Sequence, residues 1–199
     1  MLTSGEIEQK SDAELVALSL ANQGNYAHLI RRYERQLLRY ILRLSNFNHE
    51  EAEDVLQDVF IKVYQNLNSF DPKLKFSSWI YRITHNEVIS AWRKNKNKSQ
   101  IISWDVDNKM VEQIVADFDI KKELDNQHLA QQIDRVFETM DFKYAQVLVL
   151  RFLENKSYKE ISDILQKSEN TVATMLSRAK KKFKETMGKK DWLKEWENK

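Results

Sequence analysis

The chain is poor in the residues that form turns and cross-links. Its 199 residues include 3 glycines, 1 proline and no cysteine. A disulfide scaffold, a thiolate zinc site and a cysteine nucleophile are therefore excluded, and the lack of cysteine fits the cytosol. Folds built from many short strands need more glycine and proline at their turns, so the composition argues against an all-β protein.

Long hydrophobic runs are also missing. The longest apolar stretch, residues 145–153, is interrupted by Arg151 and is far shorter than the roughly 20 residues that cross a membrane. The first residues lack the basic start and apolar core of a signal peptide. We expect a cytoplasmic protein that is not inserted in a membrane.

Charges nearly balance, at a net +2, but they are unevenly distributed. Residues 71–100 hold seven basic and two acidic residues, and residues 178–190 hold seven basic and one acidic. Between them, residues 101–134 hold three basic and eight acidic residues. Two basic blocks separated by an acidic stretch suggest two contacts with a polyanion, although such runs can also be solvated faces.

Helical periodicity dominates the sequence. Ser11 and Glu14 form a capping-box pattern, and apolar residues then recur every three or four positions in three longer segments: residues 26–44, 49–68 and 77–94. The pattern predicts an all-α fold of two small helical domains, residues 8–95 and 129–187. An acidic linker (96–128) would join them, and residues 188–199 would form a tail.

The second domain contains the pattern of a helix-turn-helix, with short helices at about residues 157–165 and 169–187 joined by a polar turn. We expect their inward faces to be formed by Tyr158, Ile161 and Leu165 in the first helix and by Val172, Leu176, Ala179 and Phe183 in the second. The alternative is an ordinary helical hairpin with a basic rim.

A helix that enters the major groove needs small or polar side chains at its start and cations that reach phosphates. The second helix carries both kinds. The groove candidates are Thr171, Thr174, Ser177 and Arg178, and the phosphate candidates are Lys180, Lys181, Lys182 and Lys184.

A second basic surface is expected in the first domain, after the loop at Pro72. Aromatic side chains beside a basic stripe suit single-stranded nucleic acid, whose bases stack while cations hold the backbone. The alternative is that Phe76, Trp79 and Trp92 belong to the core. The candidate contacts are Lys73, Lys75, Phe76, Arg82, Asn86, Ser90, Arg93 and Lys94.

Asp54, Gln57 and Asp58 share one polar helix face. Two carboxylates at this spacing could serve acid–base or metal chemistry, but no histidine joins them at ligand spacing. A solvated or protein-docking face is the preferred interpretation. We therefore predict no catalytic residue, no metal site and no cofactor.

Three segments together resemble the bacterial RNA polymerase sigma factors of the sigma-70 family, in the extracytoplasmic-function (ECF) group. The resemblance covers about residues 10–187. The segments are Glu53–Phe60 (EDVLQDVF), Phe76–Asn86 (FSSWIYRITHN), and Tyr158–Ile161 (YKEI) followed by Thr171-Val172.

The resemblance implies two partners for the chain, core RNA polymerase and promoter DNA, and an anti-sigma factor as a third. Residues 53–65 would dock on the clamp helices of the largest polymerase subunit through Asp54, Gln57 and Asp58. The acidic linker would thread toward the polymerase active-site channel.

The resemblance also implies how the DNA is contacted. The loop from Phe70 to Phe76 would capture a base flipped from the non-template strand of the −10 element, with Asn86, Ser90 and Arg93 near that strand. The −35 element would be read by Ala173, Thr174, Ser177 and Arg178.

The sequence departs from the family pattern at Ser90, where many relatives carry Asp, and at Gln166 and Asn170, where Gly is common. Two other classes of function stay open. A free-standing helix-turn-helix regulator would explain only the second domain and would bind DNA as a dimer. An enzyme using Asp54 and Asp58 would lack a metal-binding histidine pattern and a phosphate loop.

Overall fold

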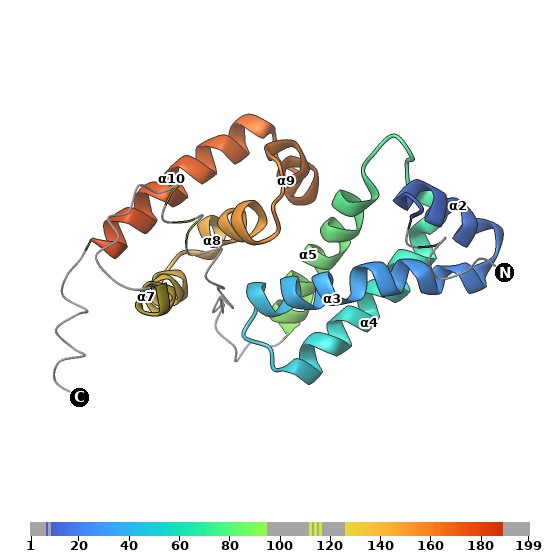
Figure 1. The fold of residues 1–199 in the computed structure, drawn as a ribbon, viewed down its shortest axis with the longest axis horizontal. Coiled ribbons are helices and arrows are strands. Elements are labelled where there is room, and N and C mark those ends of the chain that lie inside the picture. The colour runs from blue at the N-terminus through green and yellow to red at the C-terminus, as the bar shows by residue number, and fades with distance from the viewer. Residues whose placement is uncertain are drawn as a thin grey trace. The chain divides into compact units, whose positions relative to one another are not determined.

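The computed structural model describes residues 9–94 and 126–188, together with the single residues 7, 112, 114 and 116. Every regular element among these residues is helical, which confirms the predicted fold class. The described residues form two compact units, the first holding most of α2–α5 and the second most of α7–α10 (Figure 1). Most of the predicted linker and the tail beyond Gly188 lie outside the described residues.

The first unit is built from four α-helices and two single 3₁₀ turns among the described residues. In chain order they are α2 (Asp12–Ala21), η1 (Gln23–Asn25), α3 (Tyr26–Leu44), α4 (His49–Asn66), η2 (Leu67–Ser69) and α5 (Phe76–Lys94).

Side-chain caps fix where two of these helices begin. The predicted capping box is present at α2: the Ser11 hydroxyl accepts from the Glu14 amide, and the Glu14 carboxylate accepts from the Ser11 amide. A second box, from Asn48 and Glu51, opens α4. Such caps satisfy backbone donors that have no partner inside the helix.

The apolar positions predicted from periodicity form the core of the first unit. In the apolar segment predicted at residues 49–68, six positions of α4 are buried, from Ala52 to Val63, and so is Leu67, the first residue of η2. In α5, Trp79, Ile80 and Val88 are buried, whereas Ile83 and Trp92 are half-buried.

Polar groups that the pattern did not single out are buried on the same helix. His85 lies with its Nδ1 3.1 Å from the hydroxyl of Tyr40 on α3. Burial lowers the pKa of His85 to about 4, so the ring is neutral at pH 7.

The second unit contains α7 (Asn126–Glu138), α8 (Phe142–Leu148), a π-helical turn η3 (Val149–Leu153), α9 (Tyr158–Leu165) and α10 (Glu169–Met187). A side-chain cap opens α8, where the Asp141 side chain accepts from the Lys143 amide. The four apolar positions predicted for α10 are all buried, and its Phe183 ring lies 5.1 Å from that of Phe137 on α7.

The predicted inward face of α9 is wrong at its two ends. Tyr158 is 41% exposed, and Leu165 is only half-buried. Ile161 and Ile164 are the buried pair instead. Tyr158 is the first residue of the helix, and its ring lies on the surface with the Arg151 guanidinium 5.7 Å from its centre.

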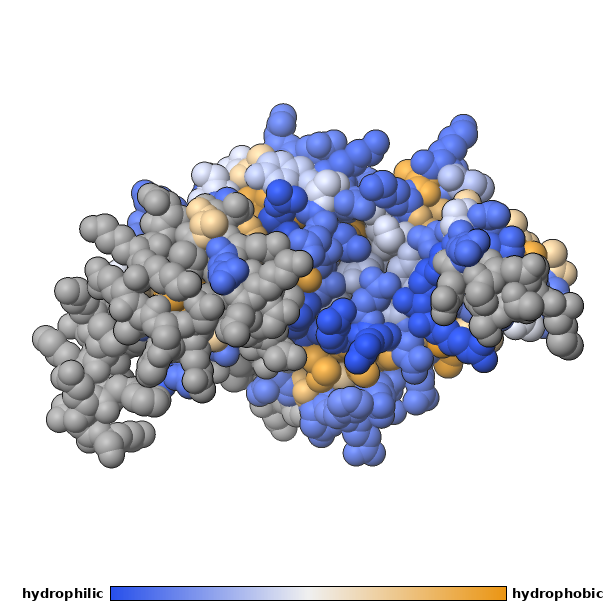
Figure 2. Space-filling model, viewed as in Figure 1, coloured by the Kyte–Doolittle hydropathy of each residue, from blue (hydrophilic) through white to orange (hydrophobic). Residues whose placement is uncertain are grey.

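The visible face of the described residues is mostly hydrophilic, with small hydrophobic areas among the hydrophilic ones (Figure 2). A helix long and apolar enough to span a membrane is not found in the part of the chain that the structure describes.

Candidate functional site

The start of α10 is held by two hydroxyl groups. The Ser168 hydroxyl accepts from the Thr171 amide at 3.2 Å and lies 2.8 Å from the Thr171 hydroxyl. One turn later, the Thr174 hydroxyl donates to the carbonyl of Asn170 at 2.9 Å. Since the Thr174 proton is used within the helix, this oxygen meets a ligand mainly as an acceptor.

Most of the candidates for duplex DNA are exposed on α10. The exposed residues are Thr171, Thr174, Ser177, Arg178 and Lys181, while Ala173 is half-buried. The Lys181 side chain is 79% exposed, and its ammonium lies 3.9 Å from Glu185. By contrast, the ammonium groups of Lys180 and Lys182 lie over aromatic rings of their own unit, those of Phe152 and Tyr144.

The turn before α10 requires a left-handed residue, and Gln166 takes that conformation, with φ of 52°. Its side-chain amide donates to the Asp163 carbonyl at 2.7 Å. The Ser162 hydroxyl donates to the Lys167 carbonyl at 2.5 Å, and the Lys167 amide returns a bond to the Ser162 carbonyl at 3.1 Å. Asn170 lies inside α10 and needs no such conformation.

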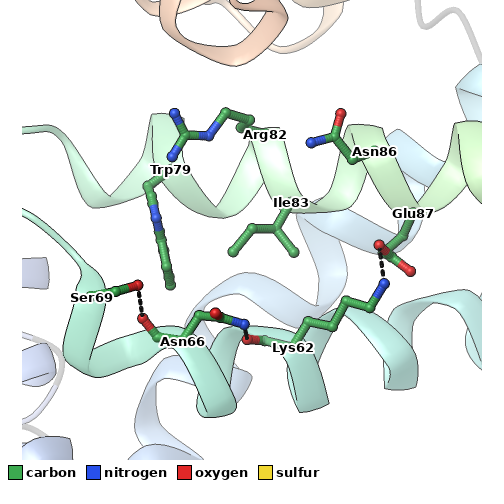
Figure 3. Close-up of a pocket in the computed structure, with 8 residues that line it drawn as sticks. All are labelled: Lys62, Asn66, Ser69, Trp79, Arg82, Ile83, Asn86 and Glu87. Atoms are coloured by element: carbon green, nitrogen blue, oxygen red, sulfur yellow. Dashed lines mark hydrogen bonds and ion pairs between the residues drawn. The ribbon is translucent and has the colours of Figure 1, made fainter.

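A pocket of about 290 Å³ lies between α4 and α5 (Figure 3). The Trp79 ring and the Ile83 side chain extend from α5 toward α4, and Arg82 and Asn86 lie along the same stretch of α5. This α4–α5 pocket is lined by Lys62, Asn66, Ser69, Trp79, Arg82, Ile83, Asn86 and Glu87.

The α4 side of the pocket is held by hydrogen bonds to the backbone. Asn66 donates to the Lys62 carbonyl at 2.8 Å, and the Ser69 hydroxyl donates to the Asn66 carbonyl at 2.7 Å. Lys62 pairs with Glu87 at 2.6 Å across the pocket. With Arg82 as a further cation, the lining carries a net positive charge and suits an anionic ligand.

The structure brings only two of the eight predicted single-strand contacts, Arg82 and Asn86, into this pocket. Lys73 and Lys75 are exposed in the loop before α5, Ser90 is half-buried, and Arg93 and Lys94 are exposed at the helix end. Phe76 is 3% exposed, so its ring packs inside the unit and does not present a face to DNA.

Sequence reasoning missed Lys62, Asn66 and Ser69, the α4 side of the pocket. These three polar residues are spaced three and four positions apart, which places them on one side of the chain, but the same spacing is typical of an ordinary solvated helix face. Nothing in their spacing linked them to Arg82, about 20 residues later in the chain.

Asp54, Gln57 and Asp58 lie together on the exposed face of α4. One turn further, Ile61 is 54% exposed, which places an apolar side chain beside them. Polar residues around an exposed apolar residue are typical of a protein-docking surface. Among the described residues, no group of three acidic, histidine or cysteine side chains is arranged to hold a metal ion.

Each helical unit matches a known family segment. Sigma-70 region 2 matches residues 29–98, and Sigma-70 region 4 matches residues 130–183. The ECF RNA polymerase sigma factor SigW of Bacillus subtilis is 30% identical over 170 residues, covering 83% of this chain and 90% of its own length. The ECF RNA polymerase sigma-E factor of Haemophilus influenzae is 29% identical over 183 residues, covering 87% of this chain and 93% of its own length.

Solved structures with the same fold include CnrH in complex with the cytosolic domain of CnrY, with a TM-score of 0.60, 21% identity and coverage of 88% of this chain and 96% of that one. Another is the sigma factor RpoE in complex with the anti-sigma factor NepR, from Bartonella quintana. Its TM-score is 0.58 and its sequence identity 18%, and the match covers 82% of this chain and 96% of that one. Because both helical units match sigma-70 regions and the match to SigW spans most of both chains, this chain belongs to the ECF sigma factors, which direct transcription initiation by RNA polymerase.

Proposed function

We propose that the α4–α5 pocket holds a base flipped out of the non-template strand of the −10 element. The observation that carries this proposal is the pocket lining: an aromatic ring and an apolar side chain suit the faces of a base, while Arg82 and Asn86 suit its edges and the phosphates. Unpairing a base costs a few kcal/mol, and capture in a pocket offsets that cost. The volume, about 290 Å³, is at the small end for ligand sites, as a single base requires.

The exposed faces of two single helices supply the other contacts. The α10 face would read the −35 element, with Arg178 at a base edge and Lys181 at a phosphate. The α4 face, defined by Asp54, Gln57, Asp58 and Ile61, would dock on core RNA polymerase. These roles are supported by exposure and by the matched family segments.

We also propose an anti-sigma partner. The similar structures contain CnrH with the cytosolic domain of CnrY and RpoE with the anti-sigma factor NepR. A partner covering the same α4 face would exclude polymerase, because one surface cannot serve both. Binding to polymerase would place the action of the protein in the cytoplasm.

The experiment measures strand opening directly. Start-site mapping with core polymerase on genomic fragments first supplies a promoter, into which 2-aminopurine is placed at the non-template −10 positions. We expect Arg82→Ala and Asn86→Ala to lower the fluorescence of the opened strand about tenfold at equal occupancy of the closed complex. Arg35→Ala, which removes an exposed cation of α3 outside the pocket, is the matched control. Equal signals from all three variants would contradict base capture.

A further inference from the structure

The two ends of the loop before α5 are joined by aromatic rings. Phe70 precedes the loop residues 71–75 and Phe76 follows them, and their rings meet edge to face with centres 5.3 Å apart. Trp79 touches both rings, at 5.4 and 5.6 Å, and also lines the α4–α5 pocket. The position of the pocket wall therefore depends on the same cluster that closes the loop.

Tyr33 on α3 connects this cluster to the N-terminal helix. Its ring lies 5.5 Å from that of Phe76, also edge to face. Its hydroxyl donates to the carboxylate of Asp12, the first residue of α2, at 2.5 Å. The other Asp12 oxygen pairs with Arg32 at 3.0 Å. Asp12 is thus held by two neighbouring residues of α3.

The Tyr33–Asp12 bond is well suited to fix α2 against the loop. Tyr33 is buried, and burial together with the Asp12 bond raises its pKa, so the hydroxyl stays protonated and donates at any physiological pH. The capping box of Ser11 and Glu14 fixes the helix start next to Asp12. The same helix also contacts η2 and α5, the elements on either side of the loop.

We propose that Asp12 and Tyr33 are positioning residues for strand capture: through the Tyr33 ring and Phe76, α2 holds the loop and the Trp79 wall in the geometry that receives the base. This role rests on the proposed function of the α4–α5 pocket. Neither residue lines the pocket, so their effect on the strand is exerted through the aromatic cluster.

The chain offers a matched control on the same helix. Tyr26 is also a buried tyrosine of α3, and its hydroxyl donates to the Phe60 carbonyl at 2.7 Å. Its ring packs on Tyr64 and not on the aromatic cluster of the loop. Tyr26→Phe and Tyr33→Phe therefore each remove one hydroxyl group and one hydrogen bond from a buried position on the same helix.

The test uses full-length variants assembled with core polymerase. A fluorescein-labelled single-stranded oligonucleotide of the non-template −10 element is titrated, and core binding and thermal unfolding are measured for the same proteins. We expect Tyr33→Phe and Asp12→Ala, which both break the Tyr33–Asp12 bond, to weaken strand binding at least about three- to tenfold, the size of one lost supporting hydrogen bond. Core affinity should match that of Tyr26→Phe, which should bind the strand like the wild type. The melting temperatures show that each variant is folded.

A double variant separates positioning from general packing. Both changes break the Tyr33–Asp12 bond, and Asp12→Ala also removes the partner of Arg32. Tyr33→Phe combined with Asp12→Ala should therefore lose no more strand affinity than Asp12→Ala alone. If the pocket variants Arg82→Ala and Asn86→Ala lose strand affinity but Tyr33→Phe binds the strand as well as Tyr26→Phe, the positioning role is overturned and the pocket function stands. If Arg82→Ala and Asn86→Ala also bind the strand normally, the pocket function fails and the positioning role fails with it.

Discussion

The two units present their candidate DNA contacts in opposite ways. In the second unit, one helix, α10, carries every candidate, and the contact surface is the exposed face of a regular helix. In the first unit, the pocket is a hollow whose lining comes from α4, η2 and α5 and whose wall depends on an aromatic cluster. A single-helix face tolerates small shifts of its neighbours, whereas a pocket shared by several elements does not. We therefore expect single changes on α10 to act locally and changes in the first unit to act at a distance.

The largest effect, a loss of affinity for core polymerase, is expected from changes on the α4 face. It tests whether changes on this exposed helix face act locally, as we expect for α10. Asp54→Arg with Asp58→Arg reverses two exposed charges without touching the core. If this face meets a basic surface of polymerase, core affinity should fall on the order of a hundredfold or more, because like charges then oppose each other across the interface. Fluorescence anisotropy with core polymerase measures the loss. Glu34→Arg on α3 is the control, and an equal effect from both would remove the docking assignment.

The next effect tests how strongly the first unit depends on its interior. His85 has a pKa of about 4 in the folded protein, against about 6.5 in an unfolded chain. As pH falls below 6.5 the unfolded chain takes up the proton first, so this contribution to stability is complete above pH 6.5 and is lost toward pH 4. Between pH 7.5 and pH 5 the unfolding free energy of the first unit should fall by about 2 kcal/mol.

Urea titrations at the two pH values check this loss. His85→Gln removes the titrating ring, so its unfolding free energy should change less over the same range. The described side chains of the second unit include no histidine, and hydrogen exchange should show that unit to be less affected. The same pH dependence in wild type and variant would assign the effect to other groups.

Changes on α10 should lower DNA affinity by a smaller amount, and different residues should affect sequence-specific binding and general DNA binding. Arg178→Ala should cost about 1–3 kcal/mol on the preferred −35 sequence and little on a scrambled one, as for a base-edge contact. Lys181→Ala should weaken both equally and lower the salt dependence by about one phosphate contact. Titrations of holoenzyme with both duplexes at two salt concentrations give the comparison. Equal losses on the two sequences for Arg178→Ala would make it a phosphate contact.

The smallest effect concerns the turn that aims α10. Gln166 is left-handed, a conformation that costs a non-glycine residue roughly 1–2 kcal/mol. Gln166→Gly should be more stable than Gln166→Ala by about 1 kcal/mol, because both variants lose the Gln166–Asp163 hydrogen bond and only glycine relieves the left-handed strain. Thermal unfolding measures the change. Gln166→Ala keeps the strain and should bring no gain, and equal stability of the Gly and Ala variants would show that the turn is not strained.

The helix faces could be predicted from the sequence, but the pocket could not. The buried positions of α4 and α10 follow from residues three and four apart, which one helix brings to one side. Asn66 and Arg82 meet only because α4 and α5 pack together, and no local pattern encodes that meeting. Phe76 was predicted to contact DNA because it lies near a basic stripe, yet its ring is used to close the loop. Tyr158 begins its helix, where the buried face is not yet established.

The closed loop of the first unit has a consequence for the energetics of promoter opening. Residues 71–75 are ordered before any strand arrives: the Leu74 amide donates to the Asp71 carbonyl at 3.0 Å, and the Lys73 amide donates to the Asp71 side chain at 2.9 Å. Ordering a free segment costs about 1–2 kcal/mol of backbone entropy per residue. Because the loop already has this conformation in the folded protein, binding a strand requires no further loss of loop entropy. More of the binding free energy of a captured base then favours the separated strands. A loop loosened by inserted glycines would bind the same base and yet open the promoter less.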